Sequence, residues 1–188
     1  MSGNKERSLL LLKPDAVSRG LVGEVIQRFE QRGFVICAMK MIHATEESMR
    51  EHYSANANNP EWLTRVGQNT IEAFREHGKD PKKEIGTDDV LEVGKRGIDW
   101  LVEFMTSGPI VAMVIKGPNA VEMVRKIVGN TMPAKADIGS IRGDYSIDSP
   151  VIATLETRTV QNLIHASGNR EEAEFEVNHW FSKEELCR

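Results

Sequence analysis

The sequence contains little cysteine, few aromatic residues and no long apolar run. Its 188 residues include only two cysteines, Cys37 and Cys187, and 6% aromatic side chains. Two cysteines so far apart in the chain form neither a metal-binding spacing nor a disulfide framework, which is typical of a reducing compartment. The four consecutive leucines near the N-terminus are too few for a signal peptide or a membrane span. These absences favour a soluble, cytoplasmic protein.

An excess of basic residues is also absent. The formal net charge of −4 at pH 7 gives no general electrostatic reason to bind nucleic acid or an anionic membrane. An RNA-binding sheet is disfavoured further, because no predicted strand is rich in aromatic residues. The glycine-rich phosphate loops G-x-x-x-x-G-K-[ST] and G-x-G-x-x-G do not occur, and neither do H-E-x-x-H or C-x-x-C. Any anionic ligand must therefore be met by a local group of cations.

The apolar pattern predicts alternating strands and helices. Short apolar runs predict buried strands over 8–13, 34–42 and 110–117. Amphipathic or capped segments predict helices over 19–33, 45–53, 119–129 and 169–181. This order indicates an α/β chain, folded as an α+β sandwich with helices on one sheet face. The simplest such arrangement is a ferredoxin-like βαββαβ core with a four-stranded antiparallel sheet.

Residues 63–97 differ from the rest of the chain, because they are charged, glycine-punctuated and weakly apolar. We expect a helix near 68–77, followed by a turn-rich return. The predicted organisation is one domain over residues 1–188 that carries this segment as an insertion at about 63–97. Such a segment could alter ligand contacts, alter assembly, or do neither.

Several polar residues stand beside predicted element ends. Lys13 closes the first strand, Arg125 lies in the helix over 119–129, and Thr131 follows that helix. Arg142 stands between two glycines, and His165 follows a short apolar pair. Taken singly, each is more often a surface or core residue than a functional one. Together they supply guanidinium donors, a point charge, a hydroxyl and a nucleophile, which are the groups needed to bind a polyphosphate and attack it.

Successive blocks of the sequence resemble the nucleoside diphosphate kinase family. The combination of "KPDAV", "IRGDY" and "NLIHAS" in this order is highly specific to it. The resemblance covers residues 6–62 and 98–185 and includes "LLLLKPDAVSRGLVGEVIQRFEQRGF", "AMKMIH", "EHY", "MTSGPIVAMV", "VRKIVGNTMP", "SIRGDY", "NLIHASGN" and "EEAEFEVNHWF".

The resemblance implies an enzyme of nucleotide and nucleoside triphosphate biosynthesis. Its substrates would be ATP and other nucleoside tri- and diphosphates, with Mg²⁺ held mainly by the nucleotide phosphates rather than by protein ligands. His165 would accept the γ-phosphoryl group and pass it to a second nucleotide in a ping-pong mechanism. A histidine with an ordinary pKa of about 6.5 is largely neutral at cellular pH, so its ring nitrogen can attack without a separate base. Phosphoryl transfer then requires mainly positioning and charge neutralisation.

The resemblance also assigns roles to residues around this histidine. Lys13 would contact the sugar hydroxyl and the transferring phosphate, and Asn162 would contact the ribose. Glu176 would orient the imidazole, and Tyr53 would help to wall its pocket. The residues expected to hold the phosphates are Arg125, Thr131 and Arg142. The family also implies a homo-oligomer, a hexamer or tetramer built from dimers.

Two positions depart from the family pattern. The family usually has an acidic residue in the turn after the histidine, where this chain has Gly168, so the rigidity of that turn is in question. The family's base-stacking aromatic residue is also missing, and Trp62 is the best replacement because its face can stack on any base. Alternatively, Trp62 only anchors the 63–97 segment. A rival function is a phosphohistidine relay, in which His165 passes its phosphoryl group to a protein.

Overall fold

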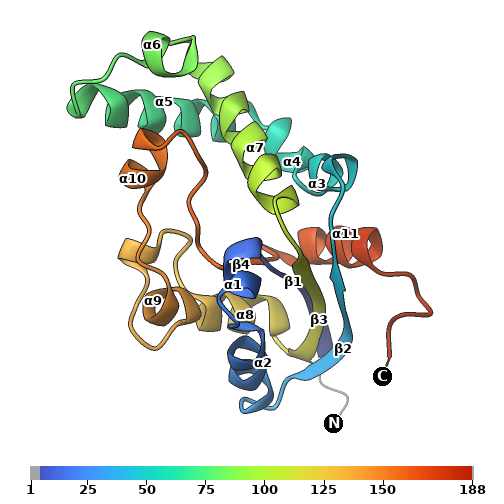
Figure 1. Ribbon diagram of the computed structural model, residues 1–188. Helices are drawn as coiled ribbons and strands as arrows, with labels where there is room; N and C mark the ends of the chain where they lie inside the picture. The colour runs from blue at the N-terminus through green and yellow to red at the C-terminus, as the bar shows by residue number, and fades with distance from the viewer. Residues whose placement is uncertain (1–4, 188) are drawn as a thin grey trace. The chain divides into compact units, whose positions relative to one another are not determined.

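The computed structural model describes residues 5–187 and contains a four-stranded antiparallel sheet in the order β2-β3-β1-β4 (Figure 1). The central strand β1 pairs with β3, placing Leu12 opposite Val111. The end of β1 also pairs with β4, placing Leu11 opposite His165. The strands are β1 (Lys5–Leu12), β2 (Val35–Ile42), β3 (Ile110–Pro118) and β4 (Ile164–Ala166). The predicted ferredoxin-like core and four-stranded antiparallel sheet are confirmed.

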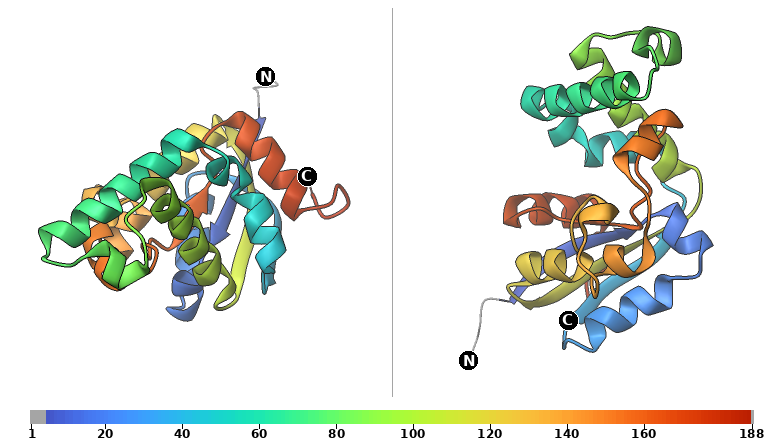
Figure 2. Two further views of the ribbon diagram at one scale, coloured as in Figure 1. Left: turned by 90° about the horizontal axis from the view of Figure 1, so that it is seen from above. Right: turned by 90° about the vertical axis from the view of Figure 1, so that its left-hand side faces the viewer.

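Helices cover both faces of this sheet. In the right-hand view of Figure 2, α11 (Arg170–Trp180) lies on one side, and α2 (Val22–Glu30) and α8 (Ala120–Val128) lie on the other. The prediction of helices on one face only is therefore wrong. The residues Leu9–Leu12 explain why both faces are covered. All four leucines are fully buried, and successive strand residues point to opposite faces. A central strand without polar alternation must be covered on both sides.

The main hydrophobic core lies between the sheet and the helices α2 and α8. Strand residues pack there against apolar side chains that recur at helical spacing, as predicted for these two amphipathic segments. The contributors include Leu10, Leu12, Met113 and Ile115 from the sheet, Val25 and Phe29 from α2, and Val124, Ile127 and Val128 from α8.

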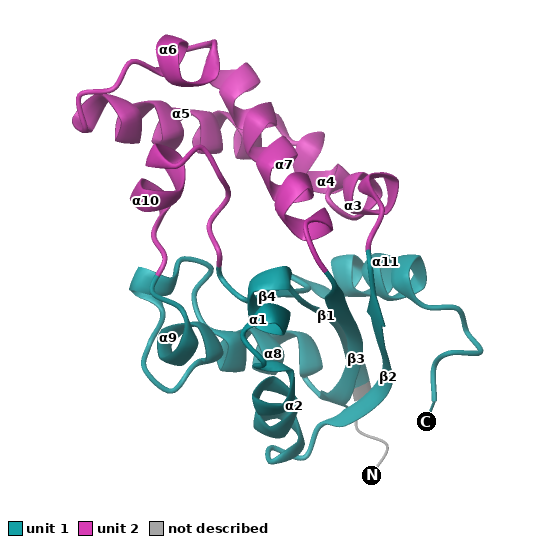
Figure 3. Ribbon diagram, in the orientation of Figure 1, with its two compact units in different colours: residues 1–43, 109–147, 162–188 teal, residues 44–108, 148–161 magenta. Residues whose placement is uncertain are grey.

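The chain divides into two compact units (Figure 3). The first comprises residues 1–43, 109–147 and 162–188, and the second comprises residues 44–108 and 148–161. The first unit holds the sheet and the shorter elements α1 (Pro14–Ser18), the 3-10 turn η1 (Pro133–Lys135) and α9 (Ile141–Tyr145).

Every regular element of the second unit is a helix. Among the described residues, no helix of either unit is both long enough and apolar enough to cross a bilayer. The helices of the second unit are α3 (Glu46–His52), α4 (Ser54–Ala57), α5 (Pro60–Glu76), α6 (Pro81–Ile85), α7 (Val90–Thr106) and α10 (Pro150–Leu155).

Two glycines allow close packing of α5 against α7. A Cβ atom added at Gly67 would lie 1.9 Å from the carbonyl oxygen of Val90, and one added at Gly94 would lie 2.3 Å from that of Leu63. The expected turn-rich return is therefore wrong from Val90 onward, where the chain is helical. Glycine is not only a turn residue, since its missing side chain also allows two backbones to approach.

Candidate active site

The pairing of β1 with β4 brings Lys13 next to Asn162. Lys13 follows the last residue of β1, and Asn162 stands just before β4, so antiparallel pairing places both at one end of the sheet. The Lys13 ammonium donates to Asn162 Oδ1 at 2.7 Å. The Asn162 amide in turn donates to the carbonyl oxygen of Thr131 at 2.8 Å. Three of the predicted site residues therefore form one connected group.

Lys13 is buried, which changes its acidity. Burial, together with the positive charge of Arg142, lowers the pKa of Lys13 from 10.5 to about 8, although Asp15 acts in the opposite direction. A buried ammonium is costly unless an anion or a set of acceptors compensates it. Lys13 is therefore a cation at neutral pH that gains from an anionic ligand.

A tight turn precedes the histidine. Leu163 has a φ angle of +69°, and the N–H of Ile164 donates to the carbonyl oxygen of Asn162 at 2.8 Å. This three-residue turn is costly for a branched side chain, because the left-handed region crowds its Cβ atom. Two flanking contacts hold it, since Leu163 N–H donates to Asp15 Oδ2 at 3.0 Å and Lys13 N–H donates to Leu163 O at 2.9 Å.

Arg142 also holds the turn at Leu163. Its guanidinium is buried and donates to three backbone carbonyl oxygens, those of Asn162 at 3.1 Å, Ile164 at 2.5 Å and Gly129 at 2.9 Å. The sequence predicted a phosphate-binding arginine here, and the structure shows that this side chain also ties three segments together. The fork of donors on a guanidinium suits such bridging, whereas an ammonium would not span all three carbonyls.

His165 is oriented by a carboxylate on α11. Its Nε2 atom lies 2.8 Å from Glu176 Oε1, and the side chain remains 19% exposed. The buried Ser167 hydroxyl donates to Glu176 Oε2 at 2.6 Å, and Leu9 N–H donates to that hydroxyl at 3.0 Å. Glu176 itself is buried. The backbone of β1 thus fixes the serine, the serine fixes the carboxylate, and the carboxylate fixes the imidazole.

The turn after the histidine is held from α11. Gly168 N–H donates to Glu172 Oε2 at 2.8 Å, and the Asn169 side-chain amide donates to Glu172 Oε1 at 2.9 Å. Asn169 also caps α11, because its side-chain oxygen accepts from Glu172 N–H at 2.8 Å. Although the family's acidic residue is missing at Gly168, a carboxylate one helical turn later restrains the backbone instead.

The remaining predicted phosphate ligands are exposed. The Thr131 side chain and Arg125 both face solvent, and Arg125 helps to line a pocket of about 430 Å³. Gly168 and Asn169, from the turn after the histidine strand, line that pocket too. Arg125 is therefore accessible to an anion, in contrast to the buried Arg142.

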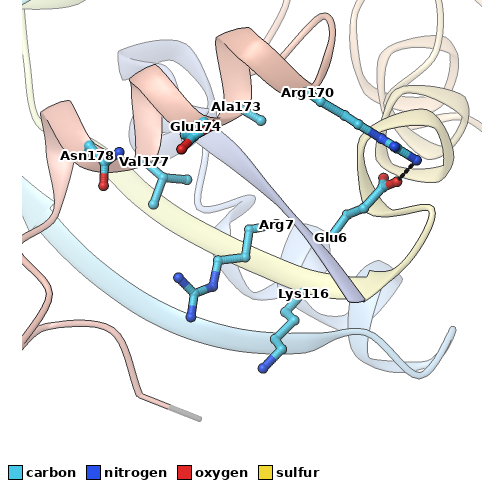
Figure 4. A pocket seen from close by; sticks show the side chains of 8 residues that line it. All are labelled: Glu6, Arg7, Lys116, Arg170, Ala173, Glu174, Val177 and Asn178. Atoms are coloured by element: carbon cyan, nitrogen blue, oxygen red, sulfur yellow. Dashed lines mark ion pairs between the residues drawn. The ribbon is translucent and has the colours of Figure 1, made fainter. Parts of the chain in front are cut away.

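A second pocket of the first unit lies at the other end of β1 (Figure 4). It measures about 500 Å³ and contains none of the predicted site residues. Arg7, at its rim, is six residues before Lys13, or about 20 Å along an extended strand. Its lining residues are Glu6, Arg7, Lys116, Arg170, Ala173, Glu174, Val177 and Asn178. Glu6 and Arg170 also line the pocket beside Arg125.

Tyr53 and Trp62 belong to the second unit. Tyr53 is buried at the end of α3, where its ring packs edge-on against His52 with centroids 4.5 Å apart. Trp62 is half-buried in the first turn of α5, and its backbone N–H donates to Asn59 Oδ1 at 3.1 Å. Their predicted roles beside the histidine and the base remain predictions.

Asp15 is a part of this site that the sequence did not indicate. Its carboxylate accepts from the backbone of Leu163 and from Ala16 N–H, in the first turn of α1. The available signal was its position directly after Lys13-Pro14, where a helix begins and an acidic side chain is favoured. No sequence pattern, however, indicated a partner 148 residues away.

The assembled group can bind an anion and attack it. It offers a buried lysine, an exposed and a buried arginine, neutral amide donors and an imidazole whose Nε2 is held by a carboxylate. Its nearby carboxylates are already engaged, Asp15 by backbone N–H groups and Glu176 by His165 and Ser167. Such a donor set suits a phosphorylated ligand.

Comparison with known proteins identifies the family of this chain. The family model "Nucleoside diphosphate kinase" matches residues 6–73 and 92–186. A nucleoside diphosphate kinase of Pyrobaculum aerophilum is 54% identical over 181 residues, which cover 96% of this chain and 97% of the relative. Residues 74–91, outside the family match, contain α6 and the start of α7.

Two solved structures are similar to this fold. The crystal structure of an NDP kinase from Pyrobaculum aerophilum covers 98% of this chain and 100% of its own, with a TM-score of 0.90 and 51% identity. The second structure is a transition-state mimic of the nucleoside-diphosphate kinase from Borrelia burgdorferi with bound vanadate and ADP, and it has a TM-score of 0.75 and 28% identity. It covers 98% of this chain and 91% of its own. The chain is therefore an enzyme that belongs to the nucleoside diphosphate kinase family.

Proposed function

We propose that His165 carries the phosphoryl group in a ping-pong exchange between a nucleoside triphosphate and a nucleoside diphosphate. In the first step a ring nitrogen attacks the γ-phosphorus, the bond to the bridging oxygen breaks, and the diphosphate leaves. In the second step a terminal oxygen of another diphosphate attacks the same phosphorus, and the N–P bond breaks. Two half-reactions allow one site to serve both substrates.

The observation that carries this proposal is the contact between His165 Nε2 and Glu176 Oε1 at 2.8 Å. A carboxylate accepts hydrogen bonds, so it favours the tautomer that bears its proton on Nε2. Nδ1 then keeps the lone pair and is the nucleophile. The positive charge that develops on the ring as Nδ1 attacks is stabilised by the adjacent Glu176 carboxylate.

The cations beside the histidine would bind the phosphates. Lys13 and Arg142 are buried neighbours at one end of the sheet, and Arg125 and Thr131 offer exposed donors. Asn162 would contact the ribose. The vanadate and ADP bound in the transition-state mimic of the Borrelia burgdorferi enzyme support a site for a nucleotide and a transferring phosphoryl group. Mg²⁺, held by the nucleotide phosphates, would supply further neutralisation of negative charge.

Incubation with ATP labelled in its γ-phosphate, together with Mg²⁺, should transfer label to the intact protein. The label should be lost in acid and retained in base, as expected for phosphohistidine. Added nucleoside diphosphate should then discharge it within the turnover time, and chelation of Mg²⁺ should suppress both steps. A label that free diphosphate does not remove would contradict the kinase and favour a protein-to-protein relay.

Because the pKa of Lys13 is lowered, we expect the enzyme to lose activity in mild alkali. Since this pKa is about 8 in the nucleotide-free protein, kcat/KM should be about tenfold lower at pH 9 than at pH 7. Lys13→Arg remains charged over this range, so its kcat/KM should be lower throughout but nearly independent of pH. A wild-type profile that is flat, or that matches the arginine variant, would contradict the assignment.

The titration of Lys13 does not lower the stability of the folded protein over the pH range in which kcat/KM should fall. The pKa of Lys13 is lower in the folded state than its ordinary 10.5, so the buried ammonium opposes folding below pH 8. That cost declines as the pH rises from about 8 to 10.5. The contribution of Lys13 to stability therefore increases over the range in which activity should fall, and a thermal melt at each pH separates the two effects.

We also propose that the chain forms a homo-oligomer, a hexamer or tetramer built from dimers. β2 is an edge strand, and it exposes Val35, Met39 and Met41 by 39%, 52% and 59%. An exposed apolar edge strand is usually covered by another chain. Light scattering of the purified protein tests this proposal, and a monomeric mass would contradict it.

The cellular role and the base contact are the last parts of the proposal. We place the enzyme in the cytoplasm, in the biosynthesis of nucleoside triphosphates. Trp62 would stack on the base, and Tyr53 would contact the histidine pocket, as the family resemblance implies. Quenching of tryptophan fluorescence by nucleotide should disappear in Trp62→Leu if the stacking proposal is correct.

A further inference from the structure

The fold places the two cysteines side by side. Cys37 is the extra residue of a β-bulge in β2, because Ile36 pairs with Ile115 and Ala38 pairs with Val114. It is only 1% exposed. Cys187, near the end of the chain, donates its backbone N–H to the carbonyl oxygen of Cys37 at 2.7 Å. Residues that the sequence separates by almost the whole chain are therefore hydrogen-bonded neighbours.

The segment after α11 is attached to β2 at a second point. Lys40, on β2, forms an ion pair with Glu185 at 2.7 Å, and its ammonium lies 4.6 Å from the centre of the Phe181 ring. Glu185 also accepts from Ser182 N–H at 2.8 Å, which closes a short turn. The position of Cys187 therefore results from several contacts rather than from a single hydrogen bond.

The backbone geometry suits a disulfide. In a hydrogen-bonded pair of extended residues the Cα atoms are roughly 5.5 Å apart, within the range of roughly 4.4–6.8 Å found in disulfides. Each sulfur makes a weak contact within its own segment, Cys37 Sγ with Val35 O at 4.0 Å and Cys187 Sγ with Glu185 O at 3.9 Å. Thiols are weak donors, so the loss of these two contacts on disulfide formation costs little.

We propose that Cys37 and Cys187 form a reversible disulfide that fastens the C-terminal segment to the edge of the sheet. Neither cysteine is part of a disulfide in this structure, and the bond would form by exchange with a small disulfide such as oxidised glutathione. The exposed Cys187 thiolate attacks first and releases one glutathione thiol. The Cys37 thiolate then attacks the Cys187 sulfur and releases the second. One disulfide is consumed and one is formed, and the two protein thiols lose their protons.

The bond would stabilise the folded chain. It closes a loop of roughly 150 residues, and long loops restrict the unfolded chain most. We expect the oxidised protein to melt on the order of 10 °C higher than the reduced protein. The clamped segment follows α11 directly, whereas neither sulfur belongs to the group around His165. Kinase activity at moderate temperature should therefore be unchanged.

The test is oxidation of the full-length protein with oxidised glutathione, followed by intact-mass measurement, thiol titration and peptide mapping. The expected product has the covalent mass of a single chain without bound glutathione and contains no free thiol. Cys37 and Cys187 should appear in one cross-linked peptide pair, and the melting temperature should be raised. A dithiol reductant should reverse each change.

Two variants make the result decisive. Cys37→Ala should retain glutathione on Cys187, because the resolving thiol is missing, and Cys187→Ser should leave the buried Cys37 unmodified. Both should melt at the same temperature with and without the oxidant. A wild-type protein that keeps glutathione on Cys187 beside a free Cys37, or that forms only cross-links between chains, would overturn the proposal.

Discussion

Replacing His165 by alanine is expected to abolish the phosphoenzyme and to lower kcat by about 10⁴-fold or more. The loss is this large because the imidazole is the proposed carrier of the phosphoryl group in both half-reactions. The ring is 19% exposed, and its Nε2 atom lies 2.8 Å from Glu176 Oε1. The variant should therefore fold. Label transfer from ATP and steady-state kinetics measure the two effects.

Replacement of a different exposed histidine is the matched control, because it shows whether the loss of any histidine lowers labelling and activity. His43 lies in the same unit on an exposed site after β2, so His43→Ala should label and turn over like the wild-type protein. Label on the His165→Ala protein, in the same acid-sensitive form, would place the phosphoryl carrier elsewhere and overturn the mechanism.

Arg142→Ala and Arg125→Ala should both lower kcat/KM but should differ in stability. Each guanidinium is proposed to meet a phosphate, and its loss should cost about 2–3 kcal/mol of transition-state binding, or roughly 30- to 150-fold. Arg142 also donates to the carbonyl oxygens of Gly129, Asn162 and Ile164. Buried acceptors that lose a charged donor destabilise a protein by a few kcal/mol. Only Arg142→Ala should therefore melt lower, by about 10 °C.

The conservative variant identifies what Arg142 does. Arg142→Lys retains the charge but cannot reach three carbonyls, so it should recover little of the melting temperature. Activity measurements below the melting transition keep the effects apart. Normal kcat/KM in both alanine variants would show that the phosphate site is misplaced, and an unchanged melting temperature in Arg142→Ala would show that the clamp on the turn contributes little.

The long elements of the first unit were predictable from the sequence, because each carries its own periodic signal. The strands β1, β2 and β3 are continuous apolar runs, and α2 and α8 show helical spacing of buried residues. The strand β4 was not predicted, since three residues are too few to show a period. The helix α7 was missed because its glycines resemble turn signals, although they serve contact with α5.

The sequence by itself determined the fold class and the family and predicted which histidine carries the phosphoryl group, since periodicity and specific motifs are local properties of the chain. The tertiary structure decided what depends on distant partners. In the folded chain, Glu176 and Ser167 orient the His165 ring. Arg142 donates to backbone carbonyl oxygens and also lies beside Lys13. The fold also brings Cys187 to Cys37, two cysteines that in sequence appeared unrelated. The reason is physical, because strand pairing and helix packing join residues whose separation along the chain carries no information about their distance.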